Sequence, residues 1–150
     1  MKRHLTKLVR SRLDACRGER ADRGVTAIEF VFLTPLLFFM IFATVQFGLY
    51  FFADHVAQAA AQAGARKARQ TADANPGGWQ GLARDKANTY IQQLGPQLLD
   101  NPAVETLPGN GETVGVRVRA DVPSVFPGMT FSVESVSQGP VERFVEDDGG

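Results

Sequence analysis

FVFLTPLLFFMIFATVQFGLYFFA, residues 30–53, contains no charged side chain in 24 consecutive residues. As a helix it would reach about 36 Å, which exceeds the roughly 30 Å hydrocarbon core of a bilayer. A helix that is hydrophobic on every side needs lipid or a large protein core around it. The rest of this 150-residue chain is too short to supply such a core. The stretch therefore predicts a transmembrane helix over residues 25–53, with Pro35 in its first turns, where a missing backbone donor matters little.

Basic residues are concentrated before this stretch. Residues 1–24 carry eight Lys and Arg against three Asp and Glu, a net charge of +5, and the rest of the chain carries −5. Because positive charge stays on the cytoplasmic side, we expect residues 1–24 to be a basic cytoplasmic leader and the C-terminal part to be exported. Topology explains the leader's charge, so the pattern indicates a lipid bilayer as partner and no nucleic acid.

The helical pattern continues beyond the apolar run. Residues 54–73 are rich in strong helix formers and lack proline, so one helix is expected to pass from the membrane into this region. Small residues recur in it at helical spacing, and they are Ala57, Ala61, Gly64 and Ala68. Such a stripe is either simply part of a good helix or a face on which another helix packs closely, and the sequence leaves both interpretations open.

A second helix is expected after the break at NPGG, residues 75–78. The pair Gly95-Pro96 should end or kink it. Its predicted apolar face consists of Ala83, Ala87, Tyr90, Ile91, Leu94 and Leu98. This helix begins a small α+β domain that we expect to cover residues 74–145.

The period of the sequence then changes from helical to alternating. Residues 113–122 predict a half-buried strand, whose inner side is Val114, Val116, Val118, Ala120 and Val122. Residues 104–107 are expected to pair with it across the turn PGNG at 108–111. Residues 129–136 should form a third strand after a turn at 123–128, with Phe131 and Val133 inward. The acidic, Gly-ended tail of residues 146–150 is expected to be disordered.

The fold class predicted from these patterns is α+β. It consists of a long N-terminal transmembrane helix followed by a small exported domain, in which a second helix accompanies a short antiparallel sheet of about three strands.

Residues suited to catalysis or metal binding are scarce. The histidines are His4 and His55, far apart in the sequence, and the single cysteine, Cys16, lies in the leader, so neither a His- or Cys-based metal site nor a catalytic triad is expected. The stretch GNGETVG at 109–115 lacks the Lys-Ser/Thr ending of a phosphate loop and precedes a strand. We therefore expect no cofactor and no enzyme, although a cleft in the region 104–145 would revive a membrane-anchored enzyme.

One carboxylate, Glu29, lies directly before the apolar run. Ionisable groups in such a place usually have a function. The competing explanation is that Glu29 sits at the membrane interface and gains slightly from the positive end of a helix dipole.

The sequence around Glu29 resembles a known processing site. GVTAIEF, residues 24–30, has the order of Gly, four residues, Glu and an aromatic residue that marks the prepilin peptidase site in type IV pilins of the Flp and Tad class. LTPLL at 33–37, QFG at 46–48, where relatives often have Glu-Phe-Gly, and AAAQAGAR at 59–66 resemble the TadE-like family of minor pilins or pseudopilins. The Val-rich strand ending at Pro123 and the strand after Pro127 also resemble that family's C-terminal region.

This resemblance implies cleavage after Gly24 by a membrane-embedded prepilin peptidase, which removes the leader and leaves Val25 as the new N-terminus. Glu29 and Phe30 then belong to the processing and assembly site. One helical turn separates positions 25 and 29, so the carboxylate can pair with its own amine or with that of a neighbouring subunit. The chain would be the peptidase's substrate.

The implied function is that of a minor pilin or pseudopilin in the bacterial inner membrane, which takes part in assembling or initiating a Flp/Tad-type pilus for adherence or secretion. A major pilin of this class would have a smaller domain. The implied partners are the prepilin peptidase, other pilins and the inner-membrane proteins that assemble the pilus.

A secreted or membrane-anchored periplasmic binding domain with an ordinary signal sequence is the alternative. Signal peptidase would then cut at Ala57-Gln58-Ala59 or at Ala59-Ala60-Ala61. The apolar run is longer than the roughly 7 to 15 residues usual in signal sequences, and these sites fall in a predicted helix.

Overall fold

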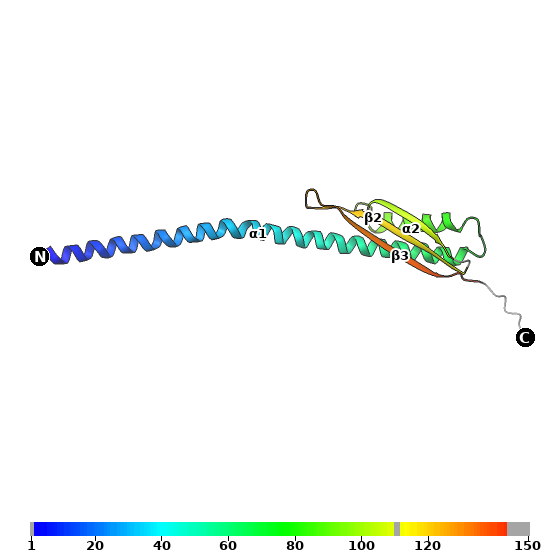
Figure 1. The fold of residues 1–150 in the computed structure, drawn as a ribbon, viewed down its shortest axis with the longest axis horizontal. Coiled ribbons are helices and arrows are strands. Elements are labelled where there is room, and N and C mark those ends of the chain that lie inside the picture. The colour runs from blue at the N-terminus through cyan, green and yellow to red at the C-terminus, as the bar shows by residue number, and fades with distance from the viewer. Residues whose placement is uncertain (1, 110–111, 144–150) are drawn as a thin grey trace, which may run out of the picture. The chain divides into compact units, whose positions relative to one another are not determined.

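The computed structural model describes residues 2–109 and 112–143, with side chains from residue 26 onward. Its elements are helix α1 (Lys2–Thr71), helix α2 (Trp79–Leu94) and strands β1 (Asp100–Pro108), β2 (Thr113–Val122) and β3 (Phe131–Pro140) (Figure 1). The chain divides into two compact units, Met1–Ala43 and Thr44–Gly150, and α1 contributes residues to both. The predicted α+β class, with a long apolar helix, a second helix and a three-stranded antiparallel sheet, is confirmed.

Helix α1 begins much earlier than the apolar run. Because it starts at Lys2, Pro35 lies inside the helix, and its predicted place in the first turns was wrong. Proline has no N–H to offer the carbonyl of Val31, one turn earlier. Beside this gap the Thr34 hydroxyl donates to the carbonyl oxygen of Phe30 at 2.7 Å.

Helix α2 ends at Leu94, where the N–H of Gly95 donates to the carbonyl oxygen of Ile91 at 3.0 Å. The predicted break at Gly95-Pro96 is thus confirmed, but the predicted apolar face was wrong at its C-terminal end. Leu94 is 46% exposed and Leu98 lies beyond the helix, because the helix stops before another turn could add to that face. Trp79, at the start of α2, is buried instead.

The sheet has the order β1-β2-β3, with both pairs antiparallel. The central strand β2 buries its five predicted inner residues. Val118 pairs with Val104 of β1, and Ala120 pairs with Val133 of β3. Strand β1 is longer than predicted and irregular between Asp100 and Ala103. Strand β3 begins at Phe131 and runs to Pro140, a shift of the predicted strand toward the C-terminus.

Some predictions fall on parts of the chain that the structure leaves out. The predicted turn at 108–111 includes residues 110 and 111, and the predicted disordered tail is residues 146–150. The turn lies partly, and the tail wholly, outside the described residues.

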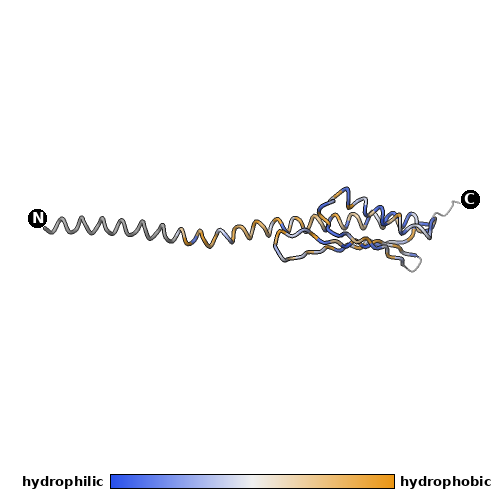
Figure 2. Tube along the Cα trace, turned by 90° about the horizontal axis from the view of Figure 1, so that it is seen from above, coloured by the Kyte–Doolittle hydropathy of each residue, from blue (hydrophilic) through white to orange (hydrophobic). Residues whose placement is uncertain are grey.

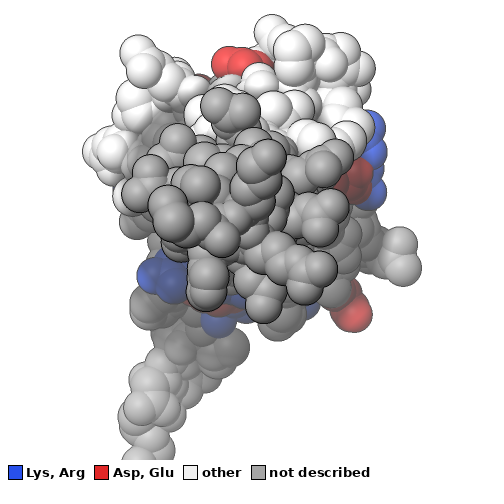
Figure 3. Space-filling view, turned by 90° about the vertical axis from the view of Figure 1, so that its left-hand side faces the viewer, with Lys and Arg blue, Asp and Glu red and all other residues white. Residues whose placement is uncertain are grey.

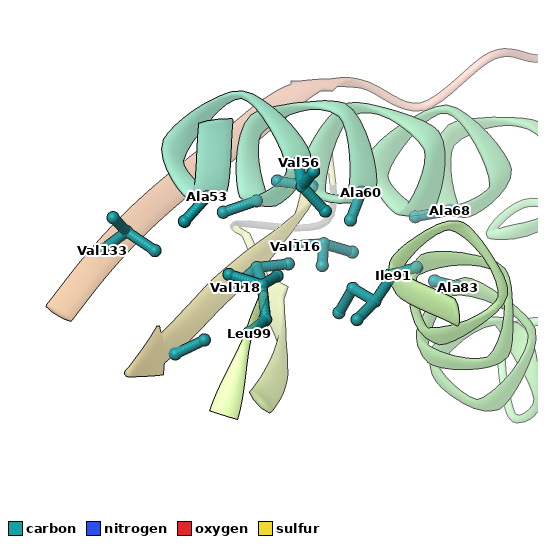
Figure 4. Close-up of a cluster of buried hydrophobic side chains, with 14 of the residues drawn as sticks. Ala53, Val56, Ala60, Ala68, Ala83, Ile91, Leu99, Val116, Val118 and Val133 are labelled. Carbon is teal, nitrogen blue, oxygen red and sulfur yellow. The ribbon is translucent and has the colours of Figure 1, made fainter. Parts of the chain in front are cut away.

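A hydrophobic core joins the C-terminal part of α1, helix α2 and the inner face of the sheet. Figure 4 shows Val56 and Ala60 of α1 above Val116 and Val118 of β2, with Ile91 of α2 beside them. Val116, Val118 and Ile91 are the largest fully buried side chains. Alanines on α1 let the helix lie close to the valines of β2, so one face of α1 is part of the domain's core.

Candidate functional site

The predicted processing site, residues 24–30, is part of helix α1. Gly24 and Val25 precede the first described side chain. Glu29 is exposed, and so is Phe30 at 70%. Position 29 follows position 25 by four residues, about one turn of helix. The carboxylate is therefore within a turn of the bond that cleavage would break, and it is open to a partner.

The apolar segment that follows is uncovered by protein. Its most apolar 18-residue window has a mean hydropathy of 2.2, and none of that window is buried. The hydrophobic colouring in Figure 2 follows this part of α1. The large apolar residues exposed between positions 30 and 42 are Phe30, Val31, Phe32, Leu33, Leu36, Leu37, Phe38, Phe39, Met40, Ile41 and Phe42. By length and composition this helix can cross a bilayer. A core helix of a soluble protein would be buried, so the exposure favours a membrane anchor.

Among the side chains of α1 that the structure describes, Gln46 is a buried polar one, with 5% of its surface exposed. Its Nε2 donates to the carbonyl oxygen of Pro123 at 3.3 Å. Its Oε1 accepts from the N–H of Val125 at 2.8 Å. The side-chain amide thus satisfies one donor and one acceptor of the β2–β3 connection and fixes that connection to α1.

The small-residue stripe of α1 lies in the core of the domain. Ala57, Ala61 and Ala68 are fully buried. A Cβ added to Gly64 would meet the carbonyl oxygen of Ala83 at 3.0 Å, and both Ala87 Cβ and Val116 Cγ2 at 3.1 Å. The stripe therefore lets α2 and β2 of the same chain approach α1 closely. In this conformation it is covered, so another chain does not have access to it.

The outer face of the sheet carries exposed ion pairs. Nε of Arg119 donates to Glu134 at 3.0 Å, and Nη2 of the same guanidinium donates to it as well. Arg117 lies between Glu134, at 3.1 Å, and Glu105, at 3.3 Å. The hydrogen bond from Arg119 lowers the pKa of Glu134 below its usual value, and the pKa of Arg119 is raised in turn. Exposed pairs of this kind contribute little stability, and here they indicate a solvated face.

A hollow of about 250 Å³ lies where the end of α1 meets α2 and the sheet. Its titratable groups among the described residues are Asp73 and Arg143, which form an exposed ion pair at 3.9 Å. No His or Cys is among the described residues that line it. Within the described part of the chain there is also no cluster of three or more metal-binding side chains.

Sequence reasoning noted Gln46 only as a replacement for an acid. Its bonds to the β2–β3 connection were missed, although a lone amide within an apolar run is the kind of residue that finds a buried partner.

Residues 24–66 match the family described as TadE-like protein. The resemblance predicted from the motifs is confirmed for this range, which begins at Gly24 and includes both Glu29 and Gln46. Strands β2 and β3, which were also expected to resemble the family, lie outside the matched range. No curated protein and no solved structure matches the chain.

Proposed function

We propose that this chain is a membrane-anchored minor pilin or pseudopilin of a Tad-type pilus. A prepilin peptidase cuts it after Gly24. The processed chain, which begins at Val25, then takes part in assembling or initiating the pilus together with other pilins and inner-membrane assembly proteins. Its C-terminal domain lies on the outer side of the inner membrane.

The observation that supports this proposal best is the position of Glu29 in the TadE-like segment. It is an exposed carboxylate at the start of an uncovered apolar helix, five residues after Gly24. Cleavage there would remove the basic leader and create an α-amino group one turn before Glu29. A cation then faces an anion at the membrane surface, an arrangement suited to pairing within or between subunits.

Gly24→Ala tests the processing step. The full chain is co-expressed with an active prepilin peptidase, and the mass of the membrane-bound product is measured. Wild type should lose its first 24 residues, whereas Gly24→Ala should stay full length, because a side chain at the cleaved bond blocks the peptidase. Gly18→Ala, a change at another glycine of the leader, should be cut like wild type. Cleavage of Gly24→Ala at the wild-type rate would refute the proposal.

The alternative, release by signal peptidase, has a structural obstacle. Ala57, Ala60 and Ala61 are helical and fully buried in the domain core. A cut at either predicted site would divide the core helix of the domain. N-terminal sequencing of the mature protein separates the two functions, because a pilin begins at Val25 and a secreted domain would begin near Ala60.

A further inference from the structure

The connection between β2 and β3 is unusual in composition. From residue 122 to 133 the sequence VPSVFPGMTFSV has no charged side chain. Two apolar residues in it face outward, since Val125 is 37% exposed and Met129 is 58% exposed. We call residues 123–130 the apolar loop. Water-facing connections are normally polar, so an uncharged loop with two exposed apolar side chains favours an apolar partner.

Two backbone N–H groups of the apolar loop have acceptors within the loop itself. The N–H of Met129 donates to the carbonyl oxygen of Phe126 at 3.3 Å, across Pro127 and Gly128. Gly128 has a φ of 79°, as the third residue of a type II turn requires. The hydroxyl of Ser124 accepts from the N–H of Phe126 at 3.1 Å. Internal pairing of this kind is needed where water is excluded.

The apolar loop is also joined to an apolar surface of the same unit. The two hydrogen bonds from Gln46 connect it to α1. The exposed apolar residues of α1 close to Gln46 in the sequence are Val45, Phe47, Tyr50, Phe51 and Phe52. In Figure 3 the described acidic and basic side chains appear as small separate groups of red and blue atoms. The loop and this part of α1 thus both expose apolar side chains, and the hydrogen bonds of Gln46 connect the two.

The position of Gln46 along the sequence gives its depth in a bilayer. The 17 residues from Glu29 to Gln46 rise about 26 Å as a helix, close to the roughly 30 Å of the hydrocarbon core. With Glu29 at the inner boundary, Gln46 lies near the outer boundary. Asp54, the next charged residue, follows eight residues later and about 12 Å farther out. The aromatic residues between them lie in the interfacial region, where Tyr and Trp are enriched.

We propose that the apolar loop is a second membrane contact of this chain, which inserts Val125 and Met129 into the outer leaflet at the boundary of headgroups and acyl chains. This inference rests on the proposed function, because that function places α1 across the inner membrane. Lipid is the favoured occupant because the hydrogen bonds of Gln46 join the loop to the anchor helix and because the loop's exposed side chains are apolar and uncharged. The contact fixes the domain's orientation toward the bilayer through two points.

Depth-dependent quenching tests the contact on the full chain in liposomes of phosphatidylethanolamine and phosphatidylglycerol. In a Cys16→Ser background, which removes the single cysteine, one cysteine at a time is introduced and labelled with an environment-sensitive fluorophore. The loop positions are Val125→Cys and Met129→Cys. Leu37→Cys marks the anchor, and Val136→Cys, at a site 47% exposed on β3, marks the domain surface. Emission of the buried Trp79 verifies that each variant is folded.

We expect labels at 125 and 129 to be quenched several-fold less by aqueous iodide than the label at 136, and to be quenched by lipids with a nitroxide near the headgroup. The loop contact would be refuted if the labels at positions 125 and 129 were as accessible to iodide as the label at position 136 while the label at position 37 stayed protected. The membrane anchor would then still be supported. If 37 were accessible too, the proposed anchoring itself would fail. Protection of the loop only after other pilins are added would identify a protein interface and overturn the lipid contact.

Discussion

At the scale of single residues, Gln46 is a polar group in an apolar run, and its two hydrogen bonds explain its presence. An amide can donate to Pro123 and accept from Val125 at the same time, and it does so while nearly buried. An ionised carboxylate at this position could accept from Val125 but could not donate to Pro123. Gln46 therefore suits this position because of the β2–β3 connection, where Pro123 lies 77 residues later in the chain.

Gln46→Glu should therefore destabilise the domain, by about 1–3 kcal/mol, since a buried carbonyl loses its donor and faces a negative charge. Denaturation of the full chain in detergent, followed by the fluorescence of Trp79, measures the change. Gln58→Glu is the matched control, because Gln58 is an exposed glutamine of the same helix. It should change stability by less than about 0.5 kcal/mol. Equal effects of the two variants would show that the bonds of Gln46 contribute nothing.

At the scale of elements, a helix or strand with a long regular hydrophobic pattern could be predicted from the sequence. Features that depend on tertiary contacts could not. The alternation of β2 and the apolar length of α1 determine each element locally, so both were predicted. Strand β1 has a short and irregular pattern, and its pairing with β2 extends it. The small-residue stripe of α1 shows most clearly what sequence cannot predict. The helical spacing of its residues indicates close packing, but it does not indicate which element packs there. Here the partner is the chain's own α2 and β2.

The position of Gly64 leads to a test of that packing. Gly64→Val should lower the free energy of unfolding by about 1–3 kcal/mol through overpacking, because one contacted atom is a backbone oxygen that cannot turn aside. Gly81→Val is the control, since nothing lies within 4 Å of a Cβ at that helical glycine. Thermal unfolding of both variants by circular dichroism gives the comparison. An unchanged domain together with weaker pilin association would instead assign the stripe to contacts between chains.

At the scale of the whole molecule, the TadE-like match covers α1 from Gly24 to Arg66 and stops before α2 and the sheet. The matched part contains both an uncovered apolar stretch and residues that are buried in the domain core. The candidate processing residues form a short local motif, so the sequence alone is enough to propose them. The sequence alone was not enough for the apolar loop, because its significance depends on the hydrogen bonds that place it beside Gln46.

Cleavage and assembly make separate demands on Glu29. Under the proposed function, cleavage would require that the bond after Gly24 reach the peptidase, whereas assembly would require a carboxylate one turn from the new amine. Glu29→Gln should keep membrane insertion, since it removes a charge beside an apolar run. We expect it to be cut after Gly24 and then to associate with other pilins about tenfold more weakly, because a charged hydrogen bond worth about 1.5 kcal/mol is lost.

Co-purification of the processed chain with other pilins in mild detergent measures this association. Glu112→Gln, a change at an exposed carboxylate of the domain, should leave recovery unchanged. The comparison is valid only for chains whose mass shows removal of the leader, because an uncut chain has no amine at Val25 to pair with. If processed Glu29→Gln recovered the other pilins as well as wild type does, Glu29 would be an interfacial carboxylate that gains only from the start of the shortened helix. Pairing between subunits would then have to come from the apolar surface of α1.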